Sequence, residues 1–304
     1  VQGDIKCHSE RSEESSSIQF LICVDPFNPL NQRSIILYPK GVFMLSVTTD
    51  YAKDTGDPSP YLKRIGEAGF SHIHWCHQWN TDFLYSKWEI EQIGFWLKEF
   101  GLKLLDLHGS AGNEKGWASA QEYQRLSGIE LVKNRIEMVA YLGSDVVIMH
   151  VPGDPESAPI RKSLDELEPF ARERNIRIAI ENGQFPAISK LLSEYSPDYL
   201  GLCYDCGHGN VTGANGLDNL EKLKDRLISV HLHDNDNSGD QHKIMFMGTV
   251  DWERLANIMA RSSYKKPVSM EVTMGRSGIP DEVEFLAKAF ETGTKFAGMI
   301  ERYR

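Results

Sequence analysis

From Gly41 onward, short apolar runs alternate eight times with longer amphipathic stretches. The apolar runs have the length and aliphatic content of buried strands; they are residues 42–48, 70–75, 102–108, 145–150, 176–181, 199–205, 227–233 and 267–272. The amphipathic stretches predict helices at residues 60–68, 87–100, 120–142, 160–174, 186–194, 217–226, 251–261 and 281–300. Eight complete strand–helix units in about 260 residues predict an α/β protein with a single-domain (β/α)8 TIM barrel. A doubly wound parallel sheet is the alternative.

Glycines follow three of the predicted helices, at Gly69, Gly101 and Gly143. Each stands between the last apolar residue of a helix and the next strand. This is the position at which helices commonly end in the left-handed conformation, which costs glycine less than any other residue. The three glycines therefore support the predicted boundaries.

Residues 1–40 do not follow the alternation. The polar, low-complexity segment 7–17 predicts a flexible or peripheral N-terminal extension, followed by the barrel in residues 41–304. The apolar run 18–24 is short and follows acidic residues, so it makes a poor secretory signal. We therefore expect a cytoplasmic protein, and the odd, low count of 5 cysteines agrees with a reducing compartment.

The overall charge narrows the classes of partner. A net charge of −10 argues against nucleic acid, because proteins that bind the phosphate backbone need a basic surface. No apolar run approaches the ~18 residues of a membrane span, so we expect no membrane partner. Assembly into a homo-oligomer is compatible with the sequence.

Four side chains stand at the ends of four successive predicted strands: Glu181, Asp205, His231 and Glu271. In a closed barrel the C-terminal ends of the strands converge on one pocket. Two glutamates, an aspartate and a histidine that meet there form an oxygen-rich site for a divalent metal ion. Most of the 10 histidines also fall at or just beyond predicted strand ends, which favours a functional site over isolated surface or core histidines.

Several motifs in the second half of the chain give a resemblance. They are Ile180-Glu-Asn182, Asp205-Cys-Gly-His208, Val230-His-Leu-His-Asp234 with Asp240-Gln-His242, Gly248 before Val250-Asp-Trp252, and Met270-Glu271. Together they resemble the xylose-isomerase-like barrel superfamily, which includes sugar phosphate isomerases and epimerases as well as AP-endonuclease-type phosphodiesterases. The motifs occur in the order and at the strand positions of that superfamily.

The resemblance implies a shared metal site on Glu181, Asp205, His231 and Glu271. His233 shares a strand face with His231, and the superfamily's register assigns the ligand to His231. The ligand set suits one divalent ion, with Mn²⁺ favoured over Mg²⁺, Co²⁺ and Zn²⁺.

The implied enzyme is a sugar isomerase or epimerase in which Glu181 and Glu271 move a proton next to a carbonyl. The small carbohydrate substrate would contact Trp75, His108, His150, His208, His233, Asp240 and His242. Core packing explains Trp75 equally well.

Three other functions remain open. AP-endonuclease-type relatives bind three zinc ions, and their additional ligands match His108, His150, His208, Asp240 and His242; the acidic composition argues against this activity. Dehydration of a keto-sugar or inosose-like substrate needs the same metal and base. A catalytically inactive binding barrel is disfavoured because every ligand and acid–base position is filled.

Overall fold

The computed structural model of the protein describes residues 43–79, 84–109 and 116–304. The chain divides into two units, Val1–Phe43 and Met44–Arg304, and the second contains all the strands and helices described below. The predicted extension, residues 1–40, lies outside the described residues.

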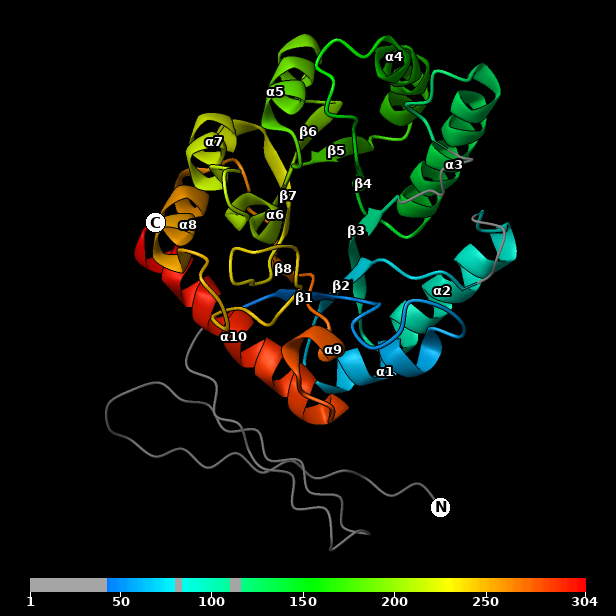
Figure 1. Cartoon of the computed structure of the whole chain (residues 1–304). Helices are drawn as coiled ribbons and strands as arrows, with labels where there is room; N and C mark the ends of the chain where they lie inside the picture. The colour runs from blue at the N-terminus through cyan, green and yellow to red at the C-terminus, as the bar shows by residue number, and fades with distance from the viewer. Residues whose placement is uncertain (1–42, 80–83, 110–115) are drawn as a thin grey trace, which may run out of the picture. The chain divides into compact units, whose positions relative to one another are not determined.

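Eight parallel strands form the centre of the second unit, with helices around them (Figure 1). The sheet order is β7-β6-β5-β4-β3-β2-β1-β8. An isolated parallel bridge between Leu232 and Met270 joins β7 to β8 and closes the ring. The strands are β1 (Leu45–Thr48), β2 (His72–Trp75), β3 (Lys103–His108), β4 (Val146–Met149), β5 (Arg177–Glu181), β6 (Leu200–Asp205), β7 (Leu227–His231) and β8 (Val268–Met270). The predicted barrel is confirmed, and the doubly wound alternative is excluded.

The eight predicted helices are present, each shifted by a few residues at most. They are α1 (Ser59–Glu67), α2 (Lys87–Glu99), α3 (Glu122–Tyr141), α4 (Ala158–Glu173), α5 (Phe185–Glu194), α7 (Gly216–Leu223) with the 3-10 turn η2 (Lys224–Arg226), α8 (Trp252–Arg261) and α10 (Glu282–Arg302). Two short helices were not predicted: α6 (Cys206–Asn210) and α9 (Met274–Ser277). They are too short to show a helical period in the sequence.

Local signals explain where several helices begin and end. Ser86 caps α2 and forms a capping box with Glu89, which satisfies backbone N–H groups that the first turn leaves free. The side chain of Asp281 accepts the Glu284 N–H at the start of α10. Gly101 and Gly143 have φ angles of 69° and 78°, as their predicted role after a helix requires.

The barrel interior is polar on the side of β1, β2, β3, β7 and β8. The buried residues Ser46, Asp106, Ser229 and Ser269 lie on these strands. A buried apolar cluster on β4 to β7 is formed by the side chains of Val146, Ile148, Ala179, Cys203 and Ile228. The polar side therefore needs hydrogen bonds, or a ligand, to offset the burial of its polar groups.

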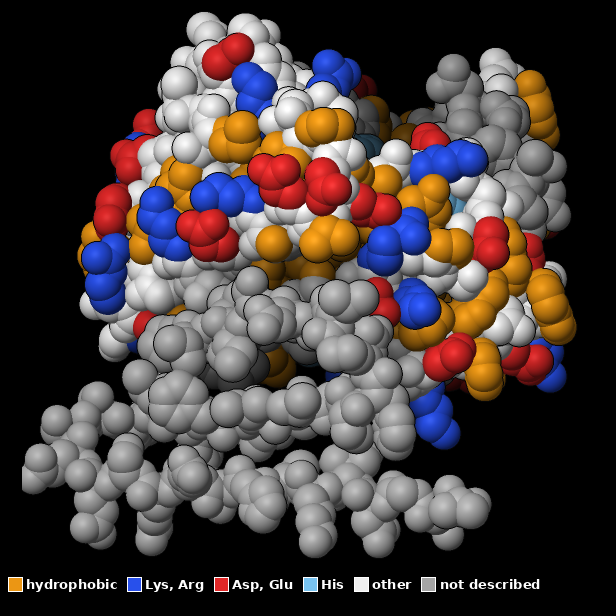
Figure 2. All heavy atoms as spheres, turned by 90° about the horizontal axis from the view of Figure 1, so that it is seen from below, with side chains coloured by type: hydrophobic (Ala, Val, Ile, Leu, Met, Phe, Trp, Pro, Cys, Tyr) orange, Lys and Arg blue, Asp and Glu red, His pale blue; other side chains and the backbone are white. Residues whose placement is uncertain are grey.

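The described helices include none that is both long and apolar enough to cross a membrane. Figure 2 shows basic and acidic side chains interspersed over the face seen from below.

Candidate functional site

The four predicted metal ligands come together at the C-terminal end of the barrel. Glu181, Asp205 and His231 are the last residues of β5, β6 and β7, and Glu271 directly follows β8. One ligand atom from each lies within 4.8 Å of the others, and all four side chains are buried. His231 Nδ1 is 2.8 Å from Glu271 Oε2 and 3.4 Å from Glu181 Oε1.

The strand pairing explains this convergence. Asp205 pairs with His231 across β6 and β7, so the two side chains leave the barrel wall at the same level. The backbone N–H of Asp205 donates to Asn182 Oδ1 over 2.6 Å, and the Asn182 amide donates back to the Asp205 carbonyl over 2.9 Å. The Asp205 carboxylate in turn accepts the His208 N–H at the start of α6. Asp205 is thus fixed by its backbone and by its side chain.

The electrostatics of the group favour charged carboxylates. Burial raises the pKa of Glu181, but His231 and His108 outweigh it and hold that pKa well below its usual range. The pKa of Glu271 is likewise low, because the pull of His231 exceeds the effect of burial. Burial lowers the pKa of His231, whereas Cys203 and the two glutamates raise it far more. In the metal-free protein an imidazolium therefore balances the glutamates.

Unpartnered atoms show that this group fits a cation. Glu181 Oε2 and both ring nitrogens of His231 are buried without a well-formed hydrogen bond, although Glu181 Oε2 lies 3.3 Å from His108 Nε2. Leaving such atoms unsatisfied costs about 1–3 kcal/mol each. A divalent ion would accept an electron pair from Glu181 Oε2 and from one ring nitrogen of His231. Three carboxylates with one imidazole match the preferences of Mn²⁺ and Mg²⁺.

Two predicted histidines adjoin Glu181 on the side of β3 and β4. His108 ends β3, and His150 follows β4 by one residue. Their Nε2 atoms lie 3.3 and 3.6 Å from Glu181 Oε2, and the three residues also have the spacing of a metal site. The His150 side chain is 54% exposed, so this side of the group faces the entrance.

The remaining predicted polar residues surround Asp240 and Asp205. Asp240 Oδ2 lies 2.8 Å from His242 Nε2 and 3.5 Å from His208 Nε2. His233 is fully buried, with Nε2 at 3.0 Å from both carboxylate oxygens of Asp205. Its ring stacks on that of His242, with centroids 4.2 Å apart. His231 thus lies within the four-residue group, and His233 beside it.

Trp75 is not among the residues brought together here. Its side chain is only 1% exposed, and its indole N–H donates to the Tyr85 hydroxyl over 3.0 Å. Its ring also meets that of His77 edge-on. These contacts are those of a core residue, so we leave Trp75 out of the proposed sugar contacts.

The structure adds a buried pair that the sequence did not reveal. His74 Nδ1 lies 2.8 Å from Asp106 Oδ1, and the other Asp106 oxygen accepts the Ser229 hydroxyl. The His74 ring also packs against His231, with centroids 4.5 Å apart. A single aspartate within the apolar strand 103–108, on the same strand face as His108, was the signal available in the sequence.

Fold and site together define a closed barrel of eight parallel strands with a buried carboxylate–imidazole group at its C-terminal end. The chain belongs to the xylose isomerase-like TIM barrel family, whose sequence profile matches residues 62–289. Over 279 residues it is 32% identical to the Sinorhizobium fredii protein called uncharacterized protein y4fM, covering 80% of this chain and 89% of that one.

Solved structures share the fold at low sequence identity. A D-tagatose 3-epimerase-like protein superposes with a TM-score of 0.69 at 19% identity, covering 85% of this chain and 98% of the other. A D-psicose 3-epimerase determined in the presence of D-fructose superposes with a TM-score of 0.64 at 16% identity, covering 84% of this chain and 97% of the other. These similarities establish the fold.

Proposed function

We propose that the protein is a divalent-metal-dependent isomerase or epimerase that acts on a sugar or keto-sugar by proton transfer next to a carbonyl. The observation that supports this most is the buried group of Glu181, Asp205, His231 and Glu271, with one ligand atom of each within 4.8 Å of the others. The names of the two solved neighbours, which are an epimerase and an epimerase-like protein, support carbohydrate as the substrate class.

The four residues would hold one divalent ion, with Mn²⁺ favoured and Mg²⁺, Co²⁺ and Zn²⁺ as alternatives. When bound, such an ion polarises a carbonyl oxygen and makes the neighbouring C–H and O–H groups more acidic. The buried carboxylates are fixed before any ligand arrives, as the hydrogen bonds of Asp205 to Asn182 and His208 illustrate. This preorganisation lowers the cost of binding.

Glu181 and Glu271 are the proposed base and acid. The low pKa of each glutamate keeps it charged near neutral pH, so each can accept a proton from carbon and, once protonated, act as the acid. Glu181 ends β5 and Glu271 follows β8, and His231 lies between them. Its Nδ1 atom is 3.4 Å from Glu181 Oε1 and 2.8 Å from Glu271 Oε2. Two carboxylates placed apart allow a proton to leave one face of a sugar carbon and another to return on the opposite face.

The half-exposed polar residues are the proposed contacts for sugar hydroxyls. His150, His208, Asp240 and His242 have side chains between 24% and 54% exposed, so a ligand can reach them. The side chain of His108 is 8% exposed and lies deeper, against Glu181. Buried His233, bonded to Asp205, would contribute mainly by holding that carboxylate in place.

Solvent exchange tests the proposal. Incubation with D-fructose, D-tagatose or D-psicose in D₂O with Mn²⁺ should place deuterium on the carbon next to the carbonyl, as read by NMR. Glu181→Gln and Glu271→Gln keep the side-chain size but remove the base, so exchange should fall by at least about 10²-fold. Glu130→Gln, an exposed position, is the matched control. Undiminished exchange in both site variants would rule out the assigned base and acid.

A phosphodiesterase of the AP-endonuclease type is the second candidate. His108, His150 and Glu181 have the spacing of an additional metal site, and Asp240 lies close to both His208 and His242. The net charge of −10 disfavours it. Nicking of an abasic DNA duplex by the zinc-loaded protein, with two or more zinc ions per chain, would favour this candidate over the sugar enzyme.

A keto-sugar or inosose dehydratase would use the same residues. Mass spectrometry separates it from an isomerase, because dehydration lowers the product mass by one water whereas isomerisation leaves the mass unchanged.

The cytoplasmic location and a homo-oligomeric state stay predictions, to be checked by fractionation and by light scattering.

A further inference from the structure

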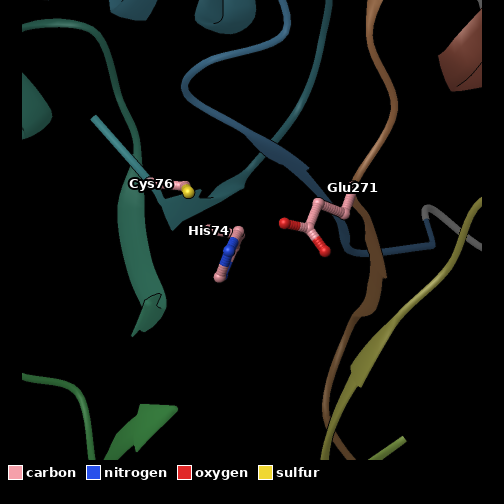
Figure 3. Close-up of side chains that lie close together, drawn as sticks. All are labelled: His74, Cys76 and Glu271. Carbon is pink, nitrogen blue, oxygen red and sulfur yellow. The ribbon is translucent and has the colours of Figure 1, made fainter. Parts of the chain in front are cut away.

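We propose a second metal site, formed by His74, Cys76 and Glu271, that binds a thiophilic divalent cation such as Zn²⁺. One ligand atom from each of the three lies within 4.8 Å of the others. Figure 3 shows the His74 ring and the Cys76 thiol on one side and the Glu271 carboxylate pointing toward them. The site adjoins the four-residue group and shares Glu271 with it.

His74 provides the strongest evidence. Its ring is fully buried, and its Nδ1 atom is held 2.8 Å from the Asp106 carboxylate, which also accepts the Ser229 hydroxyl. Its Nε2 atom is buried without a hydrogen-bond partner among the described residues. Metal-binding histidines commonly donate one ring N–H to a carboxylate and bind the ion through the other nitrogen. Asp106 therefore leaves Nε2 of His74 ready for a cation.

Cys76 adds a sulfur ligand at a fixed position. It directly follows β2, and its backbone N–H donates to the Thr49 hydroxyl over 3.0 Å. The thiol is free and half-buried. Burial and the nearby carboxylates of Asp50 and Glu271 raise its pKa, so the metal-free thiol keeps its proton. A bound cation converts such a thiol to the thiolate, and the proton leaves to solvent.

Glu271 connects the two sites. Its Oε2 atom lies 2.8 Å from His231 Nδ1, in the four-residue group, while the same carboxylate belongs to the group with His74 and Cys76. The rings of His74 and His231 are neighbours, with centroids 4.5 Å apart. One carboxylate can therefore bridge two ions, as in other two-metal sites.

The ligand chemistry distinguishes the two ions. One nitrogen, one sulfur and one oxygen suit a borderline cation such as Zn²⁺ or Co²⁺, whereas the four-residue group is rich in oxygen and suits Mn²⁺. If the proposed function holds, zinc at the second site also engages the glutamate that moves the proton. Zn²⁺ should then inhibit the Mn²⁺-loaded enzyme.

Cobalt substitution tests the site, because cobalt thiolates absorb in the near-ultraviolet. The full chain is stripped with a chelator and titrated with Co²⁺ while absorbance and bound metal are measured. We expect a thiolate-to-cobalt charge-transfer band in the intact protein. Cys76→Ser should lose the band and bind one Co²⁺ fewer per chain. Cys206 is a buried cysteine whose thiol lies 3.0 Å from the His233 carbonyl. The control variant Cys206→Ser should keep both the charge-transfer band and the number of Co²⁺ ions bound by the intact protein.

Two results would overturn the site: no band in the intact protein, or a band of undiminished intensity in Cys76→Ser. A measurement on the unmodified chain guards against a variant that fails to fold. Zinc should slow alkylation of Cys76 by a thiol reagent at least tenfold, read by peptide mass, and equal rates with and without zinc would contradict the proposal.

The two proposals fail separately. A cobalt–thiolate band without deuterium exchange from any tested sugar would support the second site and count against the proposed function. Deuterium exchange without a cobalt–thiolate band would support the proposed function and count against the second site.

Discussion

The Nδ1 atom of His74 lies 2.8 Å from Oδ1 of Asp106, and both side chains are buried inside the barrel. Burial raises the pKa of Asp106, but the hydrogen bond with His74 and the Ser229 hydroxyl together bring it below its usual value. Asp106 is therefore a charged group in the barrel interior. Such a pair contributes little net stability when intact, but its disruption is costly.

We expect Asp106→Asn to lower the free energy of unfolding by about 3 kcal/mol, because the variant leaves a buried imidazole without its charged partner. Urea unfolding measures this, with the exposed Asp198→Asn as a control that should change it by less than about 0.5 kcal/mol. The lowered pKa means that Asp106 stabilises the fold above its unfolded pKa of about 3.9 and loses this effect as the pH falls. An unchanged stability in Asp106→Asn would contradict a charged Asp106.

A second prediction concerns Gly207 in α6. A Cβ atom at this position would lie 1.9 Å from Cε1 of His233, so alanine must displace the ring that is bonded to Asp205. Displacing a residue that orients a metal ligand typically costs 10–100-fold in metal affinity. We expect such a loss of Mn²⁺ affinity in Gly207→Ala by calorimetry. Gly298→Ala in α10, where a Cβ meets nothing within 4 Å, should bind Mn²⁺ normally.

The pair of His242 and Asp240 predicts a pH dependence of the metal-free protein. Burial lowers the pKa of His242, but the hydrogen bond with Asp240 and the charge of Glu271 raise it to about 9. Because this pKa exceeds the unfolded value of about 6.5, protonated His242 stabilises the fold below that value. The stabilisation is lost as the pH rises through about 9.

Asp240→Asn removes the partner and should flatten this alkaline loss in urea unfolding measured from about pH 6 to 9. His208, whose pKa is raised to about 10 by Asp205 and Asp240 against the effect of burial, should respond in the same direction. The Asp198→Asn control should keep the wild-type profile. A wild-type profile in Asp240→Asn would show that Asp240 does not hold the charge of these histidines.

Deleting residues 1–38 should leave the melting temperature and Mn²⁺ affinity close to those of the full chain. The unit Met44–Arg304 contains all eight strands and every residue of the two proposed metal sites. Thermal unfolding and calorimetry compare the two chains. A fall of many degrees would show that the barrel depends on the segment that was removed.

The sequence predicted the barrel and the meeting of the four strand-end residues, because both follow from short-range patterns. The alternation of strands and helices fixes the direction of each strand, and that places Glu181, Asp205 and His231 at the same end. The alternation of side chains along a strand also predicts which residues face the site, and the prediction for Trp75 did not use it. His74 and Trp75 are consecutive in β2 and must point to opposite faces, so a buried site at His74 puts Trp75 in the outer core.

The contact between His74 and Asp106 could not be predicted, because it depends on how β2 and β3 are aligned. The two residues are direct neighbours in the sheet only because the register shifts between Ile73 and His74. An irregularity of this kind has no reliable local signal, and a shift of one residue would turn the side chains to the other face. The role of Cys76 depends on the same alignment.

The barrel is closed between β7 and β8 by little backbone pairing. Leu232 donates its N–H to Ser269 over 3.0 Å, and Glu271 donates to Leu232 over 3.2 Å. His231 and Glu271 lie on the two sides of this junction, so an ion that binds both would link β7 to β8. Local opening of the fold should concentrate at such a weakly paired junction. Metal binding should then slow amide hydrogen exchange at Leu232 and Glu271 more than along the well-paired junction of β5 and β6. The exchange rate at the junction of β7 and β8 therefore reports directly whether the metal site is filled.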